Sequence, residues 1–196
     1  MKKMLILGVL SIFVISSNYA QTRIPVKAGE NTLQLVSNEK SGLSLLNNVA
    51  YIDVQLEKRT QGENVELIMT GYGNTFNVGN PDLPALSRLI EVPADATVEV
   101  NVIGYSEVTL KLSDYDINKP IAPAQESVSK SADPDKIPYV KNNQVYATNA
   151  WFSNPIATFQ EVGIMRGVRI GRIEINPLAY NAVTGELKIF NDLKIQ

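Results

Sequence analysis

Short runs in which apolar and polar residues alternate constrain the fold of this chain more than any other feature. Residues 97–103 alternate strictly, so that Val98, Val100 and Val102 fall on one face of an extended strand. Similar runs recur at 49–57, 65–69, 108–112, 168–175 and 186–190. Gly, Pro and Asn separate these runs, as turns between strands require. We therefore predict an all-β fold, an antiparallel β-sandwich or a barrel-like domain with short helical turns.

Helical periodicity is weak throughout the chain. No segment keeps a 3.6-residue period over three turns, which leaves room for short helical turns only. We expect one such turn at residues 82–89. Residues 29–46 fit either a strand or a helical stretch.

The first twenty residues form a separate unit. Lys2 and Lys3 precede an apolar run at 4–15, and small and polar residues fill 16–20. This order is typical of a secretory signal peptide, and the run is too short for a stable membrane span. A lipoprotein anchor would need a cysteine at the cleavage point, and the chain has none. We predict a signal peptide at 1–20 and a secreted domain at 21–196 (periplasmic, outer-surface or extracellular), with no membrane span after cleavage.

Two residue types are missing, and their absence excludes several kinds of site. The chain has no cysteine and no histidine. It therefore contains no Ser-His or Cys-His catalytic pair, no imidazole-based zinc site and no disulfide. Its formal net charge is −2 and no basic patch stands out, so nucleic acid is not an expected partner. We conclude that the chain is not an enzyme by itself.

The segment 113–137 is long for a connection inside a compact domain. Residues 127–140, which overlap the end of this segment, read SVSKSADPDKIPYV. This stretch has too few large apolar side chains to form a buried face. The prolines favour extended conformations in the residues before them. We predict an exposed loop or a linker between two subdomains. An extended segment with a long cation, Lys130, near its start suits a peptide lying in a protease cleft, and an ordinary loop between strands is the alternative.

Two acidic pairs are the candidates for a metal site. Asp114 with Asp116, and Asp133 with Asp135, each place two carboxylates two residues apart. Such pairs can share a calcium ion if loop carbonyls assist, but neither has the spacing of an EF-hand loop. We interpret both pairs as solvated turn residues and predict no metal and no cofactor.

One group of cations and one aromatic pair also stand out. Arg166, Arg169 and Arg172 recur every three residues within a predicted strand, a spacing that indicates a solvated strand edge. Trp151 and Phe152 are adjacent aromatic residues, which we expect to lie in the core or to contact a partner.

Three stretches, in order, resemble the propeptide of gingipain-type cysteine peptidases. Residues 78–100 read VGNPDLPALSRLIEVPADATVEV, and 132–140 read ADPDKIPYV, similar to the family's G-x-P-x-L-P-x-L-S-R segment and to its P-D-x-I-P-Y loop. Residues 166–190 are similar to the family's closing segment from R-G-x-R to P-L-x-Y-N-P-V-T. Ala182 stands where the family usually has Pro, and Phe190 where it has Tyr. The resemblance covers about residues 45–196.

The resemblance implies a fold, a partner and a site. It implies an all-β prodomain that holds a secreted cysteine endopeptidase latent and assists its folding. The catalytic domain of that peptidase is then the partner, in cis or in trans. A basic residue before the Pro-Asp-x-Ile-Pro loop enters the specificity pocket of the enzyme, and Lys130 matches that position. The implied inhibitory loop contains Ser129, Lys130, Ser131, Asp133, Pro134 and Asp135.

Two other functions fit the same residues. One is a free-standing secreted inhibitor or chaperone of a separately encoded peptidase, and the other is a structural or adhesive β-module. Residues 191–196 still alternate like a strand, so we expect the chain to be a piece of a longer precursor. A reading frame that continues into a domain with Cys and His would distinguish the prodomain from both alternatives.

Overall fold

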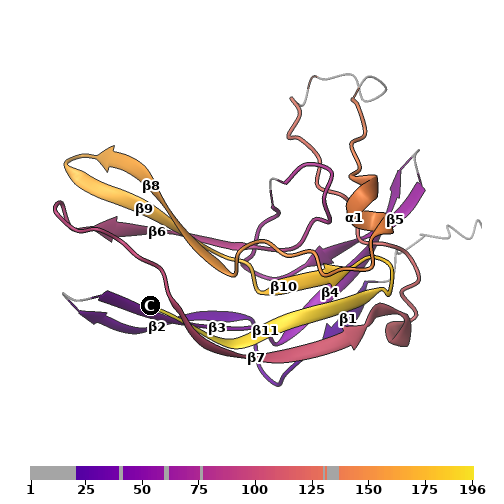
Figure 1. The fold of residues 1–196 in the computed structure, drawn as a ribbon, viewed down its shortest axis with the longest axis horizontal. Coiled ribbons are helices and arrows are strands. Elements are labelled where there is room, and N and C mark those ends of the chain that lie inside the picture. The colour runs from indigo at the N-terminus through magenta and orange to yellow at the C-terminus, as the bar shows by residue number, and fades with distance from the viewer. Residues whose placement is uncertain (1–20, 40–41, 60–61, 76, 130, 132–136) are drawn as a thin grey trace, which may run out of the picture.

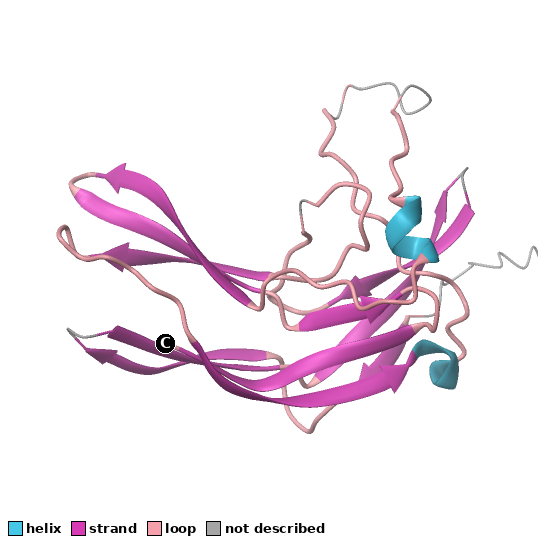
Figure 2. Ribbon diagram, in the orientation of Figure 1, coloured by secondary structure: helices cyan, strands magenta, loops and turns pink. Residues whose placement is uncertain are grey.

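The protein is built from strands, with two short helical segments (Figures 1 and 2). The computed structural model describes residues 21–196 apart from 40–41, 60–61, 76, 130 and 132–136, so the predicted signal peptide at 1–20 lies outside it. The strands are β1 (Thr22–Pro25), β2 (Thr32–Glu39), β3 (Gly42–Asn48), β4 (Tyr51–Arg59), β5 (Gly62–Ile68), β6 (Leu86–Val92), β7 (Val102–Lys111), β8 (Ala157–Met165), β9 (Val168–Ile175), β10 (Leu178–Asn181) and β11 (Glu186–Ile195). The helical segments are η1 (Leu112–Tyr115) and α1 (Asn143–Ala147). Among the described residues, no helix has the length and apolarity needed to cross a membrane.

The strands form three sheets, and the predicted all-β antiparallel fold is confirmed. One sheet has the order β1-β4-β5, a second β10-β11-β3-β2 with β7 also paired to β11, and a third β6-β9-β8. The strand pairs within them are antiparallel. In Figure 1 the first sheet faces β10, β11 and β7 in a sandwich, while β6-β9-β8 and β2-β3 diverge from it as two wings.

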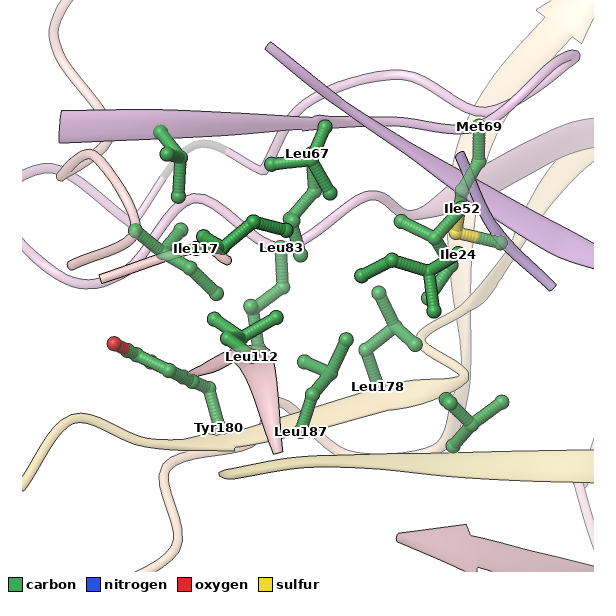
Figure 3. Close-up of a cluster of buried hydrophobic side chains, with 14 of the residues drawn as sticks. Ile24, Ile52, Leu67, Met69, Leu83, Leu112, Ile117, Leu178, Tyr180 and Leu187 are labelled. Carbon is green, nitrogen blue, oxygen red and sulfur yellow. The ribbon is translucent and has the colours of Figure 1, made fainter. Parts of the chain in front are cut away.

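Two clusters of buried apolar side chains form the core. The larger one fills the sandwich, where strands of the first sheet face β10 and β11 (Figure 3). Its labelled members are Ile24, Ile52, Leu67, Met69, Leu83, Leu112, Ile117, Leu178, Tyr180 and Leu187. The smaller one lies toward the wings and contains Leu45, Leu86, Ile173, Ile175, Leu193 and Ile195. Since no disulfide assists, burial of these side chains supplies the main stabilisation.

Strand β11 contributes to both clusters. Leu187 and Ile189 point into the larger cluster, and Leu193 and Ile195 into the smaller one. Asn191 is buried between the two pairs. The pairing of β11 with β7 is irregular between these two pairs of residues.

The side chain of Asn191 marks that irregularity. Its Oδ1 accepts a hydrogen bond from Val49 N at 2.9 Å, and its Nδ2 donates to Val49 O at 2.9 Å. Oδ1 also accepts from Asp192 N, and Asp192 has a positive φ of 49°. The register of the β7–β11 pair shifts between Asn191 and Lys194. A bulge in β11 is therefore tied by one amide to a segment 142 residues away.

One expectation about helical structure is wrong, and one open alternative is decided for strands. Residues 82–89 form no helical turn: Ala85 exchanges two backbone hydrogen bonds with Gly73, and β6 begins at the next residue. Strand β9 pairs with β6 along its whole length, and this pairing overrides the weak helical preference of residues 82–89. Residues 29–46 hold strand β2 and most of β3 rather than a helix.

The predicted strands at 97–103 and 108–112 are also placed differently. Strand β7 starts at Val102 and runs to Lys111 without a break, because β11 is a continuous partner along that length. Residues 97–101 precede it outside any assigned strand, although Asn101 exchanges two backbone hydrogen bonds with Gln196. Alternation predicts an extended backbone, but the partner decides where a strand begins.

Arg169 is not the solvated edge residue that its spacing indicates. Its Nε and Nη2 donate to both carboxylate oxygens of Glu161, and its Nη1 donates to Ala96 O at 2.6 Å and to Pro93 O at 3.2 Å. The Glu161 carboxylate raises the pKa of the Arg169 guanidinium. The side chain therefore ties β8 and β9 to the chain that follows β6. By contrast, Arg172 makes one hydrogen bond to Gln160 in an exposed setting.

Truncation of Leu187 tests the role of β11 in the core. Leu187 is fully buried, so Leu187→Ala should lower the free energy of unfolding by about 2–5 kcal/mol. Val183→Ala, at a half-exposed turn residue, is the control and should change it by less than about 0.5 kcal/mol. Urea unfolding followed by circular dichroism measures both. Equal effects would show that the sandwich is not held by this strand.

Replacement of Asn191 tests the bulge. Asn191→Leu keeps the number and branching of the side-chain heavy atoms but leaves Val49 N–H and C=O buried without partners, which should cost about 2 kcal/mol or more. Asn38→Leu, on exposed strand β2, is the matched control and should be nearly neutral. The same unfolding measurement applies, and a neutral Asn191→Leu would mean that the two backbone groups find other partners.

Candidate functional site

Part of the predicted exposed segment 113–137 is buried. Its buried residues include Ile117, Ile121, Ala122 and Ala124. Val65 N donates to Pro120 O, and Ala122 N donates to Val65 O, so this part lies along β5 through a parallel bridge. Apolar residues separated by prolines thus form an anchored strip, which corrects the prediction of exposure for about 117–124.

The chain leaves the body after this strip and returns before α1. Figures 1 and 2 show the described ends of the excursion projecting beside α1 and β5, away from the wings. Ser129 and Ser131 are exposed on it. Ser131 N donates to Ser129 Oγ at 3.3 Å, and the two hydroxyl oxygens are 2.9 Å apart. Lys130, Asp133, Pro134 and Asp135, also predicted site residues, lie outside the described residues.

Gln125 joins the two ends of the excursion, which we call the neck of the loop (residues 124–125 and 140–142). Its Oε1 accepts a hydrogen bond from Val140 N at 3.0 Å, and its Nε2 donates to Val140 O at 2.7 Å. The same Nε2 lies 3.0 Å from Ala124 O and 3.1 Å from Pro123 O. The amide therefore holds its own segment and the returning segment together.

A turn at Gly79 and Asn80 forms the floor of the neck. Gly79 N donates to Ala124 O at 2.8 Å, and Gly79 O accepts from Asn142 N at 2.8 Å. Gly79 has a φ of +84°, and a Cβ there would lie 3.1 Å from Val140 Cγ1 and 3.2 Å from Asn142 N. Glycine is required at this position because both the backbone conformation and the close approach exclude a side chain.

The returning segment is held by two further side chains. Asn142 Nδ2 donates to Asn80 Oδ1 at 2.8 Å, and Asn142 Oδ1 accepts from Val145 N as the N-cap of α1. Tyr146 donates its hydroxyl to Ile121 O at 2.7 Å. Burial raises the pKa of the Tyr146 phenol well above its ordinary value, so the group remains a donor at neutral pH. Helix α1 thereby packs against the anchored strip.

A small pocket of about 310 Å³ lies beside the neck and is lined in part by Gln125, Glu57, Glu66 and Asp82. The Asp82 carboxylate already accepts hydrogen bonds from Asn74 Nδ2 and from Thr75 N. Within the described parts of the chain, no group of three or more acidic side chains gathers as a metal site. These residues support the neck.

The sequence predicts an exposed segment here but does not identify the residues that hold its ends. Gln125, Gly79 and Asn142 carry no motif for chemistry, and their partners across the neck lie 15 to 63 residues away along the chain. The only available signal was the turn-forming sequence around Gly79 in the stretch that resembles the gingipain propeptides. The arrangement presents a segment of backbone on a fixed base, which suits binding rather than catalysis.

Comparison with known proteins places the chain among propeptides. The sequence profile of the family Propeptide_C25 matches residues 26–196. Lys-gingipain of Porphyromonas gingivalis strain ATCC 33277 is 33% identical over 198 residues, which cover 100% of this chain and 11% of the relative. Gingipain R2 of the same strain is 31% identical over 175 residues, which cover 87% of this chain and 22% of the relative. The chain thus spans about a tenth to a fifth of these relatives.

Two solved structures have the same fold. A chain from a structural study of the zymogenic latency of gingipain K from Porphyromonas gingivalis superimposes with a TM-score of 0.84 at 30% identity, covering 90% of this chain and 96% of that one. A chain from the complex of the pro- and mature domains of Porphyromonas gingivalis RgpB gives 0.69 at 28% identity, with coverages of 83% and 81%. From its sequence and its fold alike, the chain belongs to the Propeptide_C25 family and is a gingipain propeptide.

Proposed function

We propose that this propeptide keeps a gingipain-like cysteine endopeptidase latent and assists its folding. The observation that carries the proposal is the neck, in which two hydrogen bonds between Gln125 and Val140 join the two described ends of the predicted inhibitory loop. The fold is that of chains studied in zymogenic latency and in a complex of pro- and mature domains, which supports a contact with a catalytic domain. The chain has no Cys or His, so the peptidase chemistry belongs to the partner.

Lys130 is the residue that we propose to enter the specificity pocket of the peptidase. An ammonium group on a flexible stem can reach an acidic group in a pocket and form a charge-assisted hydrogen bond there. Ser129 and Ser131, on either side, are exposed and bonded to each other, so the residues that flank position 130 are accessible to a partner. The similarity to Lys-gingipain over the whole chain favours a peptidase that accepts lysine.

Asp133, Pro134 and Asp135 follow Lys130 in the sequence, and we propose that they belong to the same inhibitory segment. Prolines favour an extended backbone, which is the conformation of a substrate in a protease cleft. We also propose that the chain is exported as part of a precursor, with 1–20 as its signal peptide. In that case the catalytic domain is encoded in the same chain. If this chain instead inhibits a separately encoded peptidase, we propose that it uses the same contacts.

Substitution of Lys130 tests the proposed function. Lys130→Ala should weaken inhibition of a Lys-specific gingipain catalytic domain by about 2 kcal/mol of binding free energy or more, because a central charged anchor is lost. Lys130→Arg should inhibit as well as the wild type only if the pocket also accepts the wider guanidinium. Inhibition constants of the purified chain and its variants measure both effects.

Lys194→Ala is the matched control. Lys194 is exposed near the C-terminal end of β11. Figure 1 shows this end of the chain beside the wings and far from α1, so removal of the side chain should leave the inhibition constant unchanged. If Lys130→Ala inhibits like the wild type, latency must come from contacts of the sandwich with the enzyme and not from this side chain.

The chain should have no peptidase activity. With neither Cys nor His, purified residues 21–196 should hydrolyse no peptide substrate with Lys or Arg before the cleaved bond. Fluorogenic substrates with the two basic residues measure this. Turnover that persists after contaminating proteases are removed would contradict the proposed role.

A further inference from the structure

We propose that Gln125 is a positioning residue that locks the neck of the inhibitory loop and makes the loop an inhibitor instead of a substrate. The proposal rests on the function proposed above and concerns how the same loop resists cleavage by the peptidase that it inhibits. Gln125 lies five positions before Lys130, so it acts on the loop through its hold on Val140 and not through the specificity pocket.

The geometry of the Gln125 amide resembles one rung of an antiparallel ladder. Its oxygen accepts from Val140 N and its nitrogen donates to Val140 O, so two opposed hydrogen bonds of 3.0 and 2.7 Å join the segments. A side-chain amide has only two N–H donors, so the contacts to Ala124 O and Pro123 O share the remaining donor. Gln125 therefore fixes its own backbone and that of Val140 at once.

The surroundings of the amide keep this rung in place. Gly79 bonds to Ala124 on one side and to Asn142 on the other, so each segment of the neck is also bonded to one common turn. Val140 Cγ1 lies close over Gly79. Tyr146 and the Asn142 cap fix the return of the chain into α1. The bonds to Gly79, Asn142 and Tyr146 restrain the base of the neck. The two Gln125–Val140 hydrogen bonds add a restraint at the side of the neck that is nearer the loop.

A held neck has two effects on a peptidase that engages the loop. First, part of the ordering entropy is already lost in the free propeptide, so binding is tighter. Second, it opposes cleavage. When the peptidase cysteine attacks the carbonyl carbon of residue 130, the peptide bond breaks, an acyl-enzyme forms and the new amine at residue 131 leaves with a proton. Because the neck keeps that amine at high effective concentration, it re-attacks the acyl-enzyme before water hydrolyses it.

Gln125→Met removes both polar atoms and keeps a similar length. Loss of the two cross-neck bonds should speed hydrogen exchange of the Val140 amide by about tenfold in the free chain. It should also weaken inhibition of a Lys-gingipain catalytic domain by about tenfold and speed cleavage of the loop by a similar factor. Gln144→Met, at an exposed position of α1, is the matched control and should change none of these. The unfolding midpoint should be unchanged in both.

Gln125→Glu separates hydrogen bonding from packing. An ionised carboxylate can accept from Val140 N but repels Val140 O, whereas a protonated carboxyl group can donate to it. The ratio of Val140 exchange in Gln125→Glu to that in the wild type should therefore fall as the pH is lowered from 7 to 4, through the usual range for Glu. A residue that only fills space would give a ratio independent of pH.

The outcomes distinguish this proposal from the proposed function. If Lys130→Ala abolishes inhibition but Gln125→Met changes neither the inhibition constant nor the cleavage rate, the lock is refuted and the proposed function stands. If Lys130→Ala has no effect, the proposed role of Lys130 fails and latency comes from contacts of the sandwich with the enzyme, whatever Gln125→Met does. Unchanged exchange at Val140 in Gln125→Met would refute the lock without any peptidase.

Discussion

The structure depends on one strand, β11, which is shared by the two hydrophobic clusters. Leu187 and Ile189 complete the sandwich, while Leu193 and Ile195 complete the core between the wings. Between these two pairs, the buried Asn191 amide ties a bulge in β11 to the backbone of Val49. Strand β10 pairs with β11 as its hairpin neighbour, and β3 and β7, which are distant in sequence, pair with it as well.

The candidate site is built on the part of the sandwich that β11 stabilises, but it lies outside the core. The anchored strip at about 117–124 adds to the edge of β5, and the neck is bonded to that strip and to the turn at Gly79. This division suits the proposed inhibitory function. A restrained base limits the entropy lost on binding, and Ser129 and Ser131 beyond it are exposed and not part of the core. Stability and inhibition can therefore change independently.

The proposed function of this chain is recognition of a peptidase, and the chain contains no Cys or His. In that function, Lys130 resembles a substrate residue and would be open to cleavage by the enzyme that it blocks. The restraint that we propose for Gln125 opposes this cleavage with hydrogen bonds, in a chain that has no cysteine to form a disulfide across the loop. It would place the control of latency several residues away from the peptide bond that follows residue 130.

The sequence by itself determined the all-β class, the lack of catalytic groups and the position of an extended polar segment around 127–140. These follow from local properties: alternation, residue types and prolines. Tertiary structure decided where strands begin, as at Val102 and Leu86, because a strand exists only where a partner does. Tertiary structure also determined the contacts of the neck. Gln125 and Val140 are 15 residues apart in the sequence, and no local pattern predicts that they are hydrogen-bonded.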